Sequence, residues 1–308
     1  MNPKPSEDLV PRDWLSDIRG AALSANTRRA IASGWSQFEA WCRFRGVEAL
    51  PCTPDTLVAF LVHRVHEGRK VATIEALAYA VNARHLAAGH VAPGASETVR
   101  ETLSGIRRSR GEPQRQAAAL TIEHVRQMRF DPASPKQLRD RALLFCAVTT
   151  GLRRSELSAL RLEHVHRADY GLSIVVPRSK GDQTGQGQTV EIVRAGPGQV
   201  CPVEAVTAWM EQLPWVEGPL FCGLRHGQHQ PSPLTGDTIN RLVKARAAGI
   251  GLDPALYSGH STRAGCATYL LEQGIPLNVV SKHLRHKSAN TTLRYDRSAT
   301  ARALEGVY

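Results

Sequence analysis

The chain has 308 residues, enough for two domains, and its 42% hydrophobic and 22% charged content is typical of a globular protein. Its 39 lysines and arginines outnumber its 28 aspartates and glutamates, so the net charge of +11 and the isoelectric point near 9.8 favour a polyanionic partner. No stretch approaches the roughly 18 apolar residues of a membrane-spanning helix, and the start lacks a signal-peptide pattern, so we expect a cytoplasmic protein with no membrane partner.

The first part of the chain has helical periodicity throughout. Apolar residues recur at steps of three and four positions over Ile31, Trp35, Phe38 and Trp41. This spacing predicts an amphipathic helix that ends near Gly46.

Three more helices and a linker are expected after it. Thr53 and Pro54 are typical of an N-cap followed by a proline in the first helical turn. Further helices are predicted over residues 72–88 and around residues 99–106. Residues 107–116 are polar and have no hydrophobic period, so we predict a linker at residues 111–119.

This linker divides the chain into an N-terminal helical domain, residues 1–110, and a second domain, residues 120–308. Residues 172–177 and 189–193 are rich in β-formers and flank a glycine-containing loop, which predicts a small antiparallel β-sheet in the larger domain. The rest of that domain is mainly α, with helices expected from residue 121 and over residues 134–151, 203–213, 235–248, 262–273, 277–284 and after Ser298.

The six cysteines are scattered and contain no C-x-x-C pair. This pattern favours reduced, mostly buried thiols over a disulfide framework or a metal site, and we expect no metal and no cofactor. The cysteines are Cys42, Cys52, Cys146, Cys201, Cys222 and Cys266.

Arg153 and Arg263 are candidates for binding a phosphate. A guanidinium offers a rigid fork of N–H donors that matches the non-bridging oxygens of a phosphodiester. Each arginine also has a structural alternative, because Arg153 could cap a helix and Arg263 could pair with a carboxylate. The presence of His260 one helical turn before Arg263 favours a site over these alternatives.

Tyr295 is the candidate nucleophile. A free tyrosine hydroxyl has a pKa near 10 in water, so such a nucleophile needs a group that takes or shares its proton. His260 and His286 are candidates for that role. The alternative is an ordinary amphipathic surface tyrosine.

Two further residues are expected to support the reaction. Lys180, at the tip of the predicted hairpin, could protonate the departing 5′ oxygen, although it could also be a solvated turn residue. Glu156 follows Arg153 by three positions and could orient it, or form an ordinary surface pair.

The ordered combination of these residues resembles the tyrosine recombinase (phage integrase) family. Its parts are Thr-Gly-Leu-Arg-Arg-Ser-Glu-Leu at residues 150–157, the hairpin lysine, His260-x-x-Arg263, and His286 followed by Tyr295. The helical first domain is most similar to that of the Cre-like branch, so the similarity covers nearly the whole chain.

The resemblance implies a two-domain recombinase whose catalytic residues are Arg153, Glu156, Lys180, His260, Arg263, His286 and Tyr295. It implies cleavage of DNA through a 3′-phosphotyrosine and strand exchange through a Holliday junction, without ATP or metal. The expected partners are double-stranded DNA with inverted-repeat target sites and further copies of the chain, as a homodimer on one site and a homotetramer in the synapse. Leu304 is expected to dock on a neighbouring subunit.

The chain departs from the family pattern at two points. His286 lies where Cre-like proteins can carry tryptophan, and Arg285 replaces a more common glycine in the turn before it. Basic residues on helices of both domains are expected to contact DNA, namely Arg28, Arg29, Lys70, Arg107, Arg108, Arg241 and Lys244.

Two other functions stay open at this point. Residues 269–284, with Gly274 at their centre, imitate a helix-turn-helix, which is typical of a non-catalytic DNA-binding regulator. A type IB topoisomerase uses the same phosphotyrosine chemistry but relaxes supercoils as a monomer.

Overall fold

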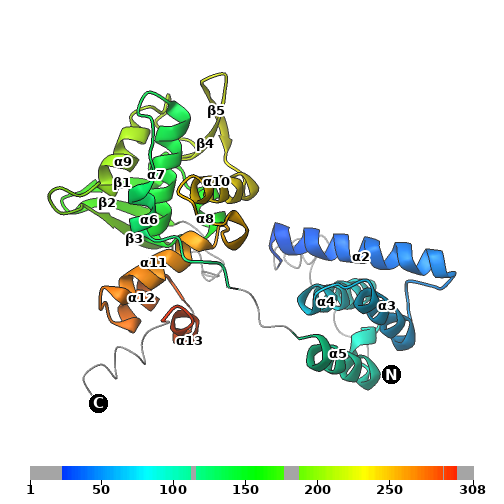
Figure 1. The fold of residues 1–308 in the computed structure, drawn as a ribbon. Helices are drawn as coiled ribbons and strands as arrows, with labels where there is room; N and C mark the ends of the chain where they lie inside the picture. Colours follow the sequence, from blue (N-terminus) through cyan, green and yellow to red (C-terminus); the bar gives the residue numbers. More distant parts are fainter. Residues whose placement is uncertain (1–22, 112–115, 177–186, 287, 297–308) are drawn as a thin grey trace, which may run out of the picture. The chain divides into compact units, whose positions relative to one another are not determined.

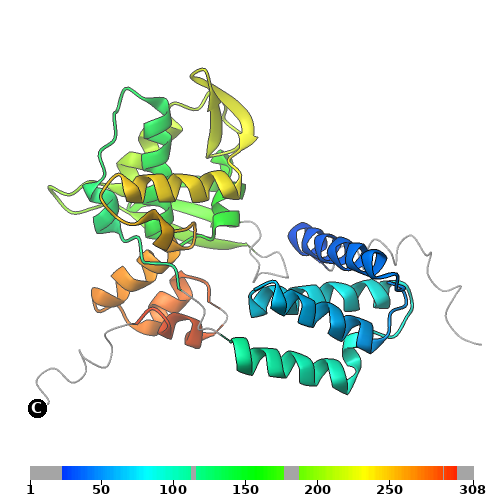
Figure 2. The same ribbon diagram turned by 45° about the vertical axis from the view of Figure 1, so that its right-hand side comes forward.

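The structure is a computed structural model that describes residues 23–111, 116–176, 187–286 and 288–296. The chain separates into two compact units, Met1–Gln114 and Arg115–Tyr308. Helices predominate in both units, and Figures 1 and 2 show them from two sides. In the described part of the chain, no helix has the length and apolarity that crossing a bilayer requires.

The described part of the first unit contains four α-helices, and each matches a predicted one. Ser24 and Thr53 cap the first two helices with their side-chain oxygens, and Gly46 ends the first with a left-handed φ of 68°. The core forms where the rings of Phe38, Trp41 and Phe60 meet. The helices are α2 (Ala25–Arg45), α3 (Pro54–His66), α4 (Val71–Ala87) and α5 (Glu97–Arg110).

The second unit is also mainly helical, with its own core. The long, largely buried helix α7 (Pro135–Thr150) runs through it and packs against helices and a strand. Around it lie α6 (Ile122–Gln127), α8 (Arg154–Ala159), α9 (Pro202–Met210), α10 (Gly236–Ala248), α11 (Ser261–Glu272), α12 (Leu277–His283) and α13 (Ala289–Leu293).

The predicted antiparallel sheet is present and has three strands in the order β1-β2-β3. β2 (Gly171–Val176) pairs with β1 (Val165–Ala168) and with β3 (Gln188–Val193). Apolar residues alternate on β3, so Val190 and Ile192 are buried while their neighbours are exposed.

A second, two-stranded sheet was not predicted from the sequence. β4 (Cys222–Arg225) and β5 (Gln228–Pro233) form a hairpin whose residues are mostly polar and largely accessible to solvent. Because little apolar surface alternates along these strands, the period that would indicate them is missing.

Glycine allows two close approaches in the second unit. Gly151 terminates α7 with a φ of 58°, and a Cβ there would lie 2.2 Å from a methyl group of Leu284. A Cβ on Gly265 of α11 would lie 1.9 Å from the carbonyl oxygen of Leu120. The first contact brings the segment after α12 against the end of α7, and the second brings α11 against the segment before α6.

Candidate active site

Arg153 lies in the turn between α7 and α8 and is held there by Glu156. Its backbone N–H donates to Glu156 Oε2 at 2.8 Å, and its Nη1 donates to Glu156 Oε1 at 2.6 Å. The side chain of Glu156 is 3% exposed and that of Arg153 is 25% exposed. The guanidinium is therefore oriented by a buried carboxylate and still reaches solvent.

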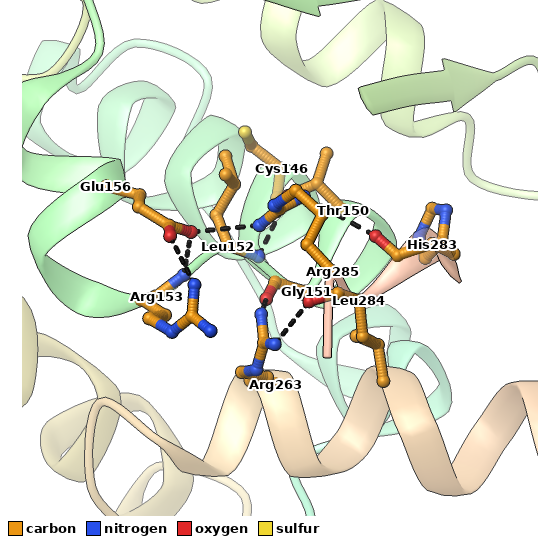
Figure 3. A network of polar contacts seen from close by, with 10 residues as sticks. All are labelled: Cys146, Thr150, Gly151, Leu152, Arg153, Glu156, Arg263, His283, Leu284 and Arg285. Carbon is orange, nitrogen blue, oxygen red and sulfur yellow. Dashed lines mark hydrogen bonds and ion pairs between the residues drawn. The ribbon is translucent and has the colours of Figure 1, made fainter. Parts of the chain in front are cut away.

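Arg263, in the first turn of α11, connects two distant segments. It is 5% exposed and donates to the backbone carbonyl of Gly151 at 2.6 Å and to that of Leu284. Among the described residues, no carboxylate forms an ion pair with Arg263. Figure 3 shows its guanidinium next to that of Arg153. A buried cation with only carbonyl partners has charge left for an anionic ligand.

A third arginine, Arg285, belongs to the same network (Figure 3). Its Nη2 donates to Glu156 Oε2 at 2.9 Å, and its side chain is 5% exposed. Glu156 thus pairs with two arginines.

His286 and Tyr295 face one another after this turn. Their rings are stacked, with centroids 6.1 Å apart and an interplanar angle of 16°. His286 Nδ1 lies 2.7 Å from the hydroxyl of the buried Thr292, and the backbone N–H of Tyr295 donates to the Thr292 carbonyl at 2.9 Å. The short helix α13 therefore places the tyrosine beside the histidine.

The electrostatics of the site follow from burial and crowded positive charge. Burial, with the charges of Arg153 and Arg285, lowers the pKa of Arg263 to about 10, while Glu156 and an ionised Tyr295 oppose the shift. Burial, with the charges of Arg263, Arg153 and Arg285, lowers the pKa of His286 to about 4. This imidazole is therefore neutral at neutral pH and keeps a nitrogen lone pair for hydrogen bonding.

Burial and neighbouring arginines also shift the pKa values of His260 and Glu156. Partial burial of the ring, followed by the charges of Arg154, Arg263 and Arg153, lowers the pKa of His260. Burial disfavours ionised Glu156, but the Arg153 backbone hydrogen bond and the charges of Arg285 and Arg153 outweigh it and lower its pKa. Glu156 is thus a carboxylate whose role is to hold arginines.

Five of the seven predicted catalytic residues take part in this arrangement directly, namely Arg153, Glu156, Arg263, His286 and Tyr295. His260, the N-cap residue of α11, lies near enough to Arg153 and Arg263 for their charges to shift its pKa. Lys180 and Leu304 lie outside the described residues.

The predicted DNA contacts lie on helices of both units. Arg28 and Arg29 are on α2, Lys70 is the N-cap residue of α4, and Arg107 and Arg108 are on α5. Arg241 and Lys244 are on α10. Arg107 forms an ion pair with Glu75, so part of its charge is already used.

Sequence reasoning missed two residues of the network. Arg285 was noted only as a departure from a glycine pattern, and an arginine at a helix-ending turn was the signal that could have drawn attention to it. Thr292, the partner of His286, carried no sequence signal, because its role depends on the fold of α13.

Comparison with known proteins identifies the family of this chain. The profile of the Phage integrase family matches residues 119–302. The integrase/recombinase xerD homolog of Selenomonas ruminantium is 32% identical over 276 residues, covering 88% of this chain and 81% of the relative. Recombinase cre of Escherichia phage P1 is 24% identical over 317 residues, covering 95% and 90%.

Solved structures share the fold. A lambda integrase dimer bound to a COC' core site has a TM-score of 0.60 at 19% identity, covering 92% of this chain and 75% of that one. XerH recombinase in a post-cleavage complex with its difH substrate has a TM-score of 0.58 at 19% identity, covering 83% and 72%.

Proposed function

This chain belongs to the Phage integrase family and is a site-specific tyrosine recombinase, and we propose that Tyr295 is the nucleophile that cleaves its DNA. The observation that carries the assignment is the position of Tyr295, stacked on His286 beside a buried Arg263 that has no carboxylate partner in the described part of the chain. The site thus combines a hydroxyl, a neutral imidazole and positive charge that no carboxylate of the described residues pairs with at Arg263.

In the proposed cleavage step, the Tyr295 hydroxyl oxygen attacks the phosphorus of a DNA phosphodiester. A P–O bond to tyrosine forms, the P–O5′ bond breaks, and the products are a 3′-phosphotyrosine and a free 5′ hydroxyl. The phenolic proton passes to a histidine of the site, and Lys180 supplies a proton to the departing oxygen. Attack by the 5′ hydroxyl of a partner strand reverses these steps, so exchange through a Holliday junction needs no ATP.

Arg153 and Arg263 stabilise the charge that builds on the non-bridging oxygens in this step. Their N–H groups are already oriented, Arg153 by Glu156 and Arg263 by two backbone carbonyls. Donors that are held in place before the reaction cost no reorganisation during it. His260 and His286 share proton transfer and hydrogen bonding to the phosphate.

The proposed binding partners are DNA and further copies of the chain, and they are inferred from the family and from the net positive charge. We propose that both units hold double-stranded DNA with inverted repeats, that two copies occupy one site, and that four form the synapse. The structural relatives include a dimer on its core site, which supports the pairing. Leu304 is proposed to dock on a neighbouring subunit, and the protein is proposed to act in the cytoplasm on the nucleoid.

Replacing Tyr295 by phenylalanine tests the assignment. The protein first selects its site from random duplex DNA, and a nicked suicide version of that site then traps the covalent complex. We expect Tyr295→Phe to bind the site normally and form no covalent complex, because the attacking oxygen is gone.

The same assay separates the alternatives. A non-catalytic regulator would lose nothing in Tyr295→Phe and would form no covalent complex in either protein. A type IB topoisomerase would relax any supercoiled plasmid as a monomer and show no site-dependent synapsis. Either result would contradict the proposed recombination.

A further inference from the structure

Arg285 occupies a backbone position that normally favours glycine. Its φ is 56°, and within the described ranges only His226 is another non-glycine residue with a positive φ. Its N–H donates to Lys282 O and the N–H of His286 donates to Ser281 O, both at 3.0 Å. These two bonds define the left-handed turn that ends helix α12, in which a side chain is strained and glycine is not.

The Arg285 side chain points away from solvent and towards a carboxylate. Its guanidinium meets Glu156, which lies 129 positions earlier in the chain. The acceptor, Glu156 Oε2, also receives the backbone N–H of Arg153, while Oε1 receives the Arg153 guanidinium. Arg285 and Arg153 are therefore held by the same carboxylate.

This contact is one of several links between the same two segments. Arg263 bonds to the Gly151 and Leu284 carbonyls, and His283 Nε2 lies 2.8 Å from the carbonyl oxygen of Thr149. The pair of Arg285 and Glu156 adds a connection from the turn that carries His286 to the residue that orients Arg153 (Figure 3).

The charges of the cluster give the contact a second consequence. If Glu156 were paired with Arg153 alone, its negative charge would cancel much of the positive charge that Arg153 offers at the site. With Arg285 also paired to Glu156, the three arginines and one carboxylate leave two positive charges for a phosphate. The Arg285 guanidinium is already paired with Glu156, whereas Arg263 donates only to backbone carbonyls among the described residues. Arg285 therefore acts through Glu156 rather than on the substrate.

We propose that Arg285 is a positioning residue for strand cleavage: it fixes Glu156 and offsets its charge, so that Arg153 keeps its orientation and its positive charge towards the scissile phosphate. This inference rests on the proposed function of the site. In this proposal Arg285 occupies a turn position that favours glycine because its side chain is needed to hold Glu156.

Arg285→Gly is the informative variant, because glycine suits the turn and removes only the side chain. Single-turnover formation of the covalent complex is measured at saturating protein, together with affinity for the selected site. We expect the rate to fall by about tenfold while the affinity changes by less than about threefold, since supporting partners of site residues have effects of this size. Lys282→Ala removes an exposed charge from the preceding helix and should keep the rate of the original protein.

A double-mutant cycle with Glu156→Gln tests whether Arg285 acts through Glu156. The double variant should be no more than about threefold slower than the slower single variant, because the shared contact is lost only once. Multiplication of the two single effects would overturn the inference, and so would an unchanged rate in Arg285→Gly or a loss of affinity equal to the loss of rate. Absence of a covalent complex in the original protein would overturn the proposed function itself.

Discussion

Single residues at this site differ mainly in how their charge is compensated. Arg139, elsewhere in the second unit, is buried with Asp140 at 2.6 Å and is satisfied by the protein itself. Arg263 is equally buried but donates only to carbonyl oxygens among the described residues. The first arrangement serves the fold, whereas the second leaves charge for a phosphate.

Loss of either arginine that we propose to bind the phosphate should slow DNA cleavage much more than it weakens DNA binding. We expect Arg153→Ala and Arg263→Ala each to reduce the single-turnover cleavage rate by at least about 10², because one preorganised transition-state donor is removed. Arg167→Ala, which removes an exposed arginine of β1, is the matched control and should cleave normally. A near-normal rate in either variant would place that arginine outside the active site.

Because of His286, we expect the free energy of unfolding to be lower in mild acid than at neutral pH. Its pKa falls from 6.5 to about 4 on folding, through burial and then through the neighbouring arginines. Between these values the unfolded chain binds a proton that the folded chain does not, so the free energy of unfolding falls as the pH falls through that window.

Urea unfolding at about pH 7.5 and about pH 5 measures this effect. His286→Asn should lose less stability between the two pH values than the original protein, because the histidine that titrates only in the unfolded chain is absent. Equal losses in both proteins would show that His286 titrates normally when folded.

At the level of elements, the site depends on how closely two segments approach the end of α7. Gly151 allows Leu284 and Cys266 of α11 to come close to that end, and Arg263 then reaches carbonyls on both sides. Gly265 in turn lets helix α11 pack directly on the backbone of the segment before α6, at Leu120. A small shift of this helix would move Arg263 relative to Arg153.

Gly265→Ala should therefore destabilise the second unit by about 2 kcal/mol, because the new methyl group would overlap the Leu120 carbonyl oxygen and force a backbone shift. Gly105→Ala, in the middle of α5, is the control: nothing lies within 4 Å of the new Cβ, so the change should stabilise its helix by about 0.5 kcal/mol. Urea unfolding of both variants checks the contrast, and equal effects would contradict the proposed contact.

For the whole molecule, the net charge of +11 makes DNA affinity depend on salt. Each phosphate contact that a lysine or arginine makes contributes about 0.9 to the slope of log affinity against log salt concentration. The slope therefore reports how many of the predicted basic residues touch the backbone.

Arg241→Ala combined with Lys244→Ala tests the contacts predicted for α10. We expect the slope to fall by roughly 2, as measured by fluorescence anisotropy over a range of salt concentrations. Arg225→Ala, on the β4–β5 hairpin, should leave the slope unchanged. An unchanged slope in the double variant would show that α10 does not touch DNA phosphates.

Features encoded within a few residues could be recognised without coordinates. The cap Thr53, the helix-ending Gly46 and the β-formers of residues 189–193 are local, because backbone hydrogen bonding and side-chain preferences act over short spans. The chemistry was indicated by the family resemblance that the ordered arginines, histidines and tyrosine carry.

Contacts across long stretches of chain depended on packing. The burial of Arg285 against Glu156, the pairing of His286 with Thr292 and the carbonyl partners of Arg263 arise only when α7, α11 and the turn after α12 meet. The polar β4–β5 hairpin likewise has no apolar period to reveal it. Periodicity shows which face of an element is buried, but the partner that a buried charge finds is decided by the assembled fold.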